Sequence, residues 1–230
     1  MLRQIFEYIL ILVQLLFDAI SHKSLLQFFR EYVFIARVVV PGFIDLTSLN
    51  CQQNPLQNAE YQFVELNLED LRAGNPSFSI RNRYFKALYR SKSGLRGFGL
   101  VKDSKVIGDI WCVAPLNRKS PISCTDLDRL GIACADGDAY AAGIFIDPAF
   151  RGNKLAVPIY LSLAFILKME GWRRIYAYYY EDNISAKWMH FMIKFKELPK
   201  LREFRFFFIR KTYKYVQTIS SIRRKYSRNE

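Results

Sequence analysis

The segment DPAFRGNKLA at residues 147–156 decides the fold, because it joins a predicted buried strand to a long apolar helix. Residues 139–146 (AYAAGIFI) have the apolar and partly β-branched content of a strand inside a sheet. Residues 155–168 (LAVPIYLSLAFILK) predict a helix that Asn153 caps and Gly171 ends. The first turn of such a helix carries unpaired backbone N–H groups and the positive end of the helix dipole. The segment therefore predicts a binding site for an anion such as a pyrophosphate.

A second strand and a second helix follow this unit directly. Residues 174–180 (RIYAYYY) have strand composition, and residues 184–194 predict a helix that begins just after Asn183. By itself, Arg-Gly-Asn before a helix is a common strand-to-helix connection. Strand, loop, helix, strand, asparagine and helix in one order form a much more specific pattern than the loop alone.

This order resembles motifs A and B of the GNAT superfamily of acyl-CoA-dependent N-acyltransferases. Motif A of that family reads [Q/R]-x-x-G-x-[G/A] after a strand that ends in V-x-P. Arg151 and Ala156 fit the pattern, and Pro148 ends the strand. Lys154 stands where the family has glycine, so its side chain either crowds the cofactor or adds an ammonium group to the phosphate site. Pro158 is expected to remove one more N–H early in the helix.

Motif B of the family has an asparagine at the end of the second strand, followed by an alanine and then a tyrosine on the helix. This chain has Asn183, Ala186 and His190 at those positions, so a histidine replaces the tyrosine. In the family this tyrosine protonates the leaving thiolate. An imidazole can donate the same proton, because it titrates near neutral pH. The alternative for His190 is simple packing between its helix and the sheet.

The resemblance implies an α/β (α+β) fold with a mixed central sheet of about six to seven strands and helices on both faces. The predicted core elements are strands at 63–66, 96–101, 105–113, 139–146 and 174–180, helices at 69–73, 81–90, 155–168 and 184–194, and a last strand at 204–214. Residues 117–137 are an irregular insertion that either shapes a substrate site or is a solvated loop. We expect an N-terminal apolar helix, strand and linker over 1–55, the acyltransferase-like domain over 56–214 and a basic tail over 215–230.

The resemblance also implies which residues bind acetyl-CoA, the expected co-substrate. The exposed backbone of the strand at 139–146 binds the pantetheine arm, and the loop amides bind the pyrophosphate. Asn183 bonds the pantetheine arm or orders the end of the second strand. The implied binding residues are Ile144, Ile146, Arg151, Gly152, Asn153, Lys154, Leu155, Ala156 and Asn183.

The catalytic candidates are His190, as the acid, and a carboxylate that acts as the general base. Many relatives carry that carboxylate at the position of Gly143 in this chain. Glu181 is therefore the first candidate for the base, and Asp138, Asp109 or a water relay are the alternatives. The alternate tyrosines of the second strand either line the same cleft or pack in the core.

Composition limits the partners and the compartment. At 230 residues with 51% hydrophobic content, the chain is long enough for one catalytic domain and an appendage. Its net charge of +13 favours an anionic partner, which includes CoA phosphates, an acidic substrate, a membrane surface or a nucleic acid. Four scattered cysteines fit free thiols in a reducing compartment. Two histidines without a ligand cluster predict that no metal is bound.

The N-terminal segment carries apolar side chains at helical spacing over residues 1–21. It is too short and too interrupted to span a bilayer, which needs ~20 largely apolar residues. We expect it to pack on the domain or on a second subunit, as in a homodimer. The alternative is contact with an anionic membrane surface, helped by the basic residues 223–228. Residues 32–40 predict a strand that Pro41 ends, and residues 45–60 predict a linker.

The function implied by the resemblance is transfer of an acetyl group from acetyl-CoA to a primary amine on a small molecule or peptide. The amine attacks the thioester directly, so the protein positions the reactants and stabilises the oxyanion. One alternative is a non-catalytic module that binds an acyl-CoA or a protein, motivated by Lys154 and Gly143. Another is a binder of anionic surfaces or nucleic acid through the basic tail, with nucleic acid the less favoured partner. The expected location is the cytoplasm, with peripheral attachment to the inner face of the membrane as the alternative.

Overall fold

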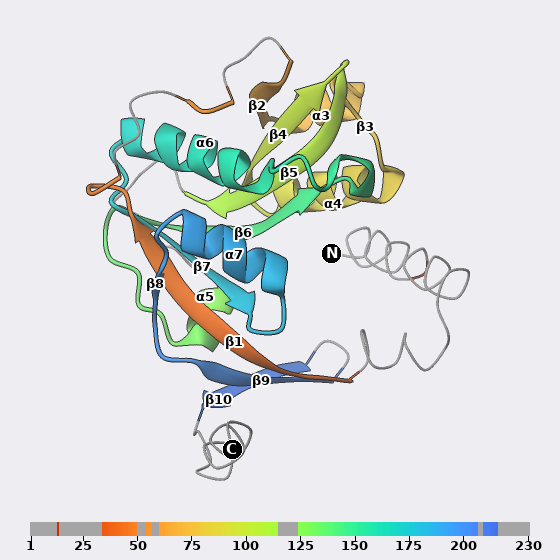
Figure 1. Cartoon of the computed structure of the whole chain (residues 1–230). Helices are drawn as coiled ribbons and strands as arrows, with labels where there is room; N and C mark the ends of the chain where they lie inside the picture. Colours follow the sequence, from red (N-terminus) through yellow and green to blue (C-terminus); the bar gives the residue numbers. More distant parts are fainter. Residues whose placement is uncertain are drawn as a thin grey trace, which may run out of the picture.

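The computed structural model describes residues 13, 34–49, 54–56, 60–114, 124–206 and 209–215. In this part of the chain ten strands form one sheet, in the order β10-β9-β1-β7-β6-β5-β4-β2, with β3 beside β5 and β8 beside β1 (Figure 1). The pairs β6–β7 and β3–β5 are parallel, so the sheet is mixed. The strands are β1 (Phe34–Asp45), β2 (Gln62–Leu66), β3 (Ser77–Phe78), β4 (Arg96–Lys102), β5 (Lys105–Val113), β6 (Asp138–Ile146), β7 (Arg174–Tyr180), β8 (Lys196–Glu197), β9 (Leu201–Phe206) and β10 (Ile209–Lys214).

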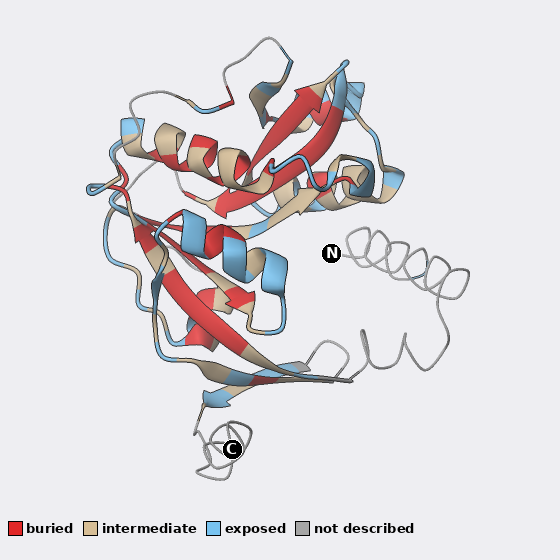
Figure 2. Ribbon diagram, in the orientation of Figure 1, coloured by how far each residue is buried: buried red, intermediate tan, exposed pale blue. Residues whose placement is uncertain are grey.

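Helices cover both faces of this sheet, as predicted. The helices are α3 (Leu68–Ala73), α4 (Arg81–Lys92), α5 (Thr125–Leu130), α6 (Ala156–Met169) and α7 (Ile184–Met192). α6 and α7 pack on one face through a large apolar cluster, and α3, α4 and α5 pack on the other face through two smaller clusters. Figure 2 shows the buried strands between these two layers. The sheet has more strands than predicted, because β1 and the hairpin β9–β10 extend it beyond β7.

Strand β1 is longer than the predicted strand and runs straight through Pro41. It pairs with β7 along one edge, and along the other edge it pairs first with β9 and then with β8. The β9 pairing ends at Val39 and the β8 pairing begins at Gly42, so Pro41 lies where the partner changes. The Pro41 carbonyl accepts from Leu198 N–H on the β8–β9 side of the strand. The Pro41 nitrogen lies on the same side, opposite the gap between β9 and β8, so its missing N–H costs the sheet no hydrogen bond. The boundary expected near residue 55 therefore does not separate β1 from the sheet.

The C-terminal segment predicted as one strand is a hairpin of β9 and β10. The insertion at 117–137 is only partly irregular, since it contains helix α5. Residues 115–123 of this region lie outside the described part. α5 packs against β10, so the insertion covers the extended end of the sheet.

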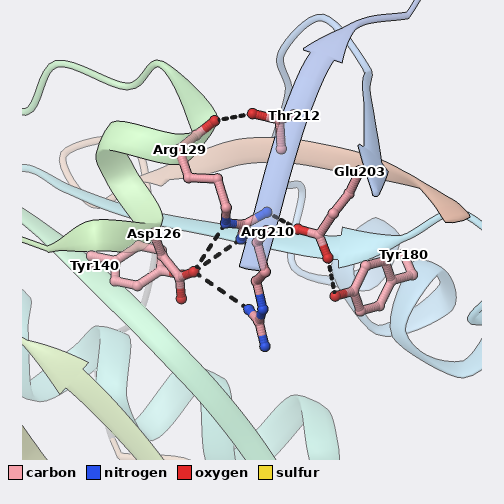
Figure 3. Close-up of polar contacts among 7 residues, drawn as sticks. All are labelled: Asp126, Arg129, Tyr140, Tyr180, Glu203, Arg210 and Thr212. Atoms are coloured by element: carbon pink, nitrogen blue, oxygen red, sulfur yellow. Dashed lines mark hydrogen bonds and ion pairs between the residues drawn. The ribbon is translucent and has the colours of Figure 1, made fainter. Parts of the chain in front are cut away.

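A network of charged side chains joins α5 to this hairpin (Figure 3). Glu203 of β9 is fully buried and forms an ion pair with Arg129 of α5. Arg129 also binds Asp126 at 3.0 Å, and Arg210 of β10 lies 3.7 Å from the same carboxylate. Tyr180 of β7 donates its hydroxyl proton to Glu203 at 2.9 Å. Tyr180 therefore packs in this network, in agreement with the packing alternative for the alternate tyrosines.

The segment expected as a linker packs against α6 where the structure describes it. Leu46 and Leu56 are buried, and the Ser162 hydroxyl of α6 donates to Asn54 Oδ1 at 2.6 Å. Apart from Val13, which is helical, the helix expected over 1–21 lies outside the described residues, as do residues 216–230 of the expected tail. Within the described ranges, no helix combines the length and apolar character needed to cross a bilayer.

Candidate active site

The loop between β6 and α6 departs from the predicted helix start. α6 begins at Ala156 with Leu155 as its N-cap residue, so the prediction that Asn153 caps this helix is wrong. Asn153 is exposed, and two residues separate it from the first helical position. Pro158 lies within the first turn, where an N–H has no partner inside the helix. It therefore removes no helical hydrogen bond, and the helix start does not need to open.

The same loop presents a run of unused backbone donors. The N–H groups of residues 152–157 donate to no acceptor within the described part of the chain. Gly152 and Lys154 have φ angles of +93° and +57°, both in the left-handed region. Left-handed residues interspersed with right-handed ones turn successive N–H groups toward one side and form an anion-binding concavity. The pyrophosphate site expected at this loop stays a prediction, and these N–H groups are its candidate donors.

Two basic side chains border this loop. Arg151 is exposed, and its Nε donates to the Ile146 carbonyl at 3.2 Å. Lys154 is also exposed and takes a backbone conformation that glycine adopts freely. Lys154 thus has the left-handed backbone conformation that a glycine at this position would adopt without strain.

Beside the loop, strands β6 and β7 separate. They pair only from Asp138 to Tyr140 on β6, although β6 continues to Ile146. Asp147 N–H donates to the Ile107 carbonyl of β5 at 2.8 Å. Because backbone groups alternate along a strand, Ile144 and Ile146 turn theirs away from β5, toward the edge that β7 has left. The structure thus brings Ile144, Ile146 and the loop residues 151–156 together along one edge.

Asn183 and His190 lie on the other side of this separation, on α7. Asn183 is the N-cap of α7, and its Oδ1 accepts from Ala186 N–H at 3.0 Å. His190 is buried, and its ring stacks on Tyr179 with 4.9 Å between ring centroids. Its Nδ1 lies 2.7 Å from the Ala186 carbonyl, and its Nε2 is buried without a hydrogen-bond partner among the described residues.

These contacts define the protonation state of His190. Nδ1 donates to the carbonyl, so Nε2 of the neutral ring carries the free lone pair. Burial lowers the pKa of His190, which favours this neutral form. Tyr160 of α6, which the sequence analysis did not select, also has a buried hydroxyl without a partner, and its ring lies 6.1 Å from that of His190. The signal in the sequence that could have identified Tyr160 is its hydroxyl group among the apolar side chains on the same face of the predicted helix.

Comparisons at the level of sequence find no matching family model and no matching curated protein. A solved Drosophila protein has a TM-score of 0.49 and 12% identity, over 75% of this chain and 52% of that one. A GNAT-family acetyltransferase from Colwellia psychrerythraea has a TM-score of 0.47 and 14% identity, over 75% of this chain and 57% of that one. An aminoglycoside N-acetyltransferase solved with CoA has a TM-score of 0.45 and 16% identity, over 61% of this chain and 91% of that one.

The solved structures that match this chain thus include acetyltransferases of the GNAT family. This chain spans a little over half the length of the Drosophila and Colwellia structures. The elements predicted along the chain around motifs A and B, a strand, a loop, a helix, a second strand and a second helix, are present as β6, α6, β7 and α7.

Of the carboxylates considered as the general base of a GNAT-like site, Glu181 and Asp109 form ion pairs, whereas Asp138 has a buried Oδ1 without a hydrogen-bond partner among the described residues. Glu181 binds Lys200 Nζ at 2.5 Å. Asp109 accepts from Arg83 Nε at 3.0 Å, and Asp138 accepts from a backbone N–H. Among the described residues, no hydrogen bond links Glu181 to His190. Within the same residues, no group of three potential ligands could hold a metal ion.

The burial of His190 predicts a measurable effect of pH on stability. The unfolded chain binds a proton on this ring as the pH falls below about 6.5. The folded chain does so only at lower pH, because its pKa is lowered. The free energy of unfolding should therefore decrease as the pH is lowered below about 6.5, by up to about 1.4 kcal/mol per pH unit. Urea unfolding between pH 7 and pH 5 should show this loss in the wild type, and His190→Gln should remove that part of it. An unchanged slope in the variant would contradict a lowered pKa at His190.

Proposed function

We propose that the protein binds acetyl-CoA along the edge of β6 and transfers its acetyl group to a primary amine. The observation that carries the proposal is the run of free N–H donors at residues 152–157, next to the edge at Ile144 and Ile146 that β7 does not pair, where Arg151 Nε donates to the Ile146 carbonyl. The donors suit a pyrophosphate, and Arg151 and Lys154 add positive charge beside them. The free strand edge suits the amide groups of a pantetheine arm, which can pair with it like a short strand.

The residues of this chain would act mainly by positioning. Bound acetyl-CoA supplies the activated thioester, and a backbone N–H at the β6 edge is available to stabilise the oxyanion. The lone pair on His190 Nε2 suits acceptance of a proton better than donation of one, since the ring is neutral. We therefore propose that His190, with Tyr160 beside it, exchanges a proton with the site through water. Glu181 would have to leave Lys200 before it could act as the base.

Calorimetry with acetyl-CoA, CoA and a longer acyl-CoA tests the binding step. Arg151→Ala should weaken acetyl-CoA binding by about tenfold, since a charge-assisted contact to phosphate is worth roughly 1.5–3 kcal/mol and this one is exposed. The matched control is Lys211→Ala, which removes an exposed cation from the far end of the sheet. Equal affinity of the two variants would contradict a phosphate role for Arg151. No binding of any CoA species by folded wild-type protein would refute the proposal itself.

A second candidate is an acyl-CoA-binding module without catalysis. The engagement of Glu181 with Lys200 and of Asp109 with Arg83 favours it, because either carboxylate would have to leave its cationic partner before it could accept a proton. The two functions differ in one measurement, which is release of the CoA thiol in the presence of a panel of primary amines. Amine-dependent thiol release supports the transferase. Saturable acetyl-CoA binding without thiol release for any amine class supports the binding module.

A further inference from the structure

Helix α4 presents three basic side chains on the face that meets the sheet. Arg83, Lys86 and Arg90 are spaced so that they lie along one side of the helix. All three are partly buried, and Asp109 of β5 is the carboxylate that acts on them. Three cations thus face one anion in a region that water only partly reaches.

Arg83 uses this single carboxylate. Its Nε and a terminal nitrogen both bind Asp109, and its guanidinium lies 4.2 Å from the centre of the Phe145 ring. Trp111 Nε1 donates to the same carboxylate at 2.8 Å. The Asp109 carboxylate therefore forms hydrogen bonds with Arg83 and Trp111, and it acts on Lys86 and Arg90 only through longer-range attraction.

Arg90 has an unused donor. Its Nη1 is buried and has no hydrogen-bond partner among the described residues, a rare condition for a charged group. Its Nη2 lies 3.4 Å from the point where a Cβ on Gly143 would stand, and only this guanidinium comes within 4 Å of that point. Gly143 is exposed and has no side chain, and Nη2 is the guanidinium nitrogen nearest to it, whereas Nη1 is itself buried. Burial, followed by the charge of Arg83, lowers the pKa of Arg90, as expected for a cation that lacks an anionic partner.

The cluster lies next to the proposed acetyl site. Ile144 and Ile146 pack on the α6 face of β6, so the alternate residues Gly143 and Phe145 face α4. The unpaired guanidinium therefore borders the same stretch of β6 whose free edge would hold the thioester. A molecule bound against Arg90 would lie within reach of that edge.

We infer that Arg90, assisted by Lys86, binds an anionic group on the acceptor amine, either a carboxylate or a phosphate. This inference rests on the proposed transferase function and specifies its second substrate. A guanidinium offers two parallel N–H donors that match the two oxygens of either group. The bound anion would contact Nη2 beside Gly143 and would balance the excess positive charge of α4. The acceptor class is thus an amino acid or a phosphorylated amine rather than a neutral or polycationic amine.

Matched amines test this inference by initial rates of thiol release from acetyl-CoA. Each amino acid is compared with its carboxamide, and O-phosphoethanolamine is compared with ethanolamine. We expect kcat/KM to favour the charged member of one pair type by at least about tenfold, as for one charge-assisted contact. The pair type that shows the preference names the anion.

Two variants separate binding from packing. Arg90→Gln should abolish the preference for the charged amine and leave acetyl-CoA affinity unchanged. It should also raise Tm by about 2–4 °C, because it removes a partly buried charge without a partner. The control Arg81→Gln removes an exposed cation from the same helix and should change neither the preference nor Tm.

The outcomes are distinguishable from a failure of the proposed function. Wild-type protein that binds acetyl-CoA and acetylates neutral amines as well as charged ones would overturn this inference and leave the transferase function intact. A preference that survives Arg90→Gln, or a variant that loses stability, would also overturn it. Protein that binds no acetyl-CoA at all would overturn the transferase function first.

Discussion

Replacing Glu203 by Gln is expected to lower the free energy of unfolding by about 3 kcal/mol or more. Glu203 is fully buried, and its carboxylate accepts from Arg129 and from the Tyr180 hydroxyl. The neutral amide would leave the guanidinium of Arg129, itself only 8% exposed, without its closest anion. Urea unfolding, read as a change in midpoint at constant slope, measures this loss.

A matched control is Glu65→Gln, which neutralises the 49% exposed partner of Arg96. This substitution should lower stability by less than about 1 kcal/mol, as is usual for exposed pairs. Arg129→Met combined with Glu203→Gln should be less damaging than the sum of the two single changes, because both charges are then absent. A loss below about 1 kcal/mol for Glu203→Gln alone would show that the network in Figure 3 does not stabilise the fold.

Replacing Gly152 by Val is expected to weaken acetyl-CoA binding by roughly 100-fold. The φ of +93° at Gly152 is unfavourable for a β-branched residue, so the loop should leave this conformation. The free N–H groups of residues 152–157 would then be presented in a different arrangement. Loss of one or two charge-assisted hydrogen bonds, each worth roughly 1.5–3 kcal/mol, accounts for the expected change. Calorimetry with acetyl-CoA measures it.

The control for this prediction is Lys154→Gly at the neighbouring left-handed position. Glycine adopts the φ of +57° without strain, so the backbone donors stay in place and only the ammonium group is lost. We expect a change of less than about tenfold in this variant, since the side chain is exposed. Unchanged acetyl-CoA affinity in folded Gly152→Val protein would show that the loop donors do not hold the cofactor. Thermal unfolding of both variants verifies that the comparison is made on folded protein.

Local signals predicted most elements of the core. The strand at 174–180 matches β7 at both ends, and the strand at 105–113 matches β5. The turn at 102–104 was placed by the two strands around it, and Asp103 and Ser104 adopt positive φ there. The helix after the loop was correct to within one residue at each end, although its N-cap was not. These features depend on periodicity and on residues close in sequence, which a single sequence displays directly.

Elements whose place depends on distant partners were predicted less well. Pro41 was expected to end a strand, yet β1 continues because β9 ends and β8 begins opposite that residue. The segment 204–214 was expected to be one strand, but β9 and β10 fold back on each other and α5 fixes them through Arg129. In both cases the deciding contact comes from a part of the chain far away in sequence.

The sequence by itself determined the order of strands and helices around residues 139–194 and the presence of a loop with free backbone N–H groups before α6, because backbone preferences and helix ends are local properties. The tertiary structure alone decided which polar groups have partners. It buried His190 against Tyr179, engaged Glu181 with Lys200, and left the Nη1 of Arg90 without an acceptor among the described residues. Hydrogen bonding and burial are set by groups that folding brings together from different elements, so the chemistry of the site follows from packing rather than from motif spacing.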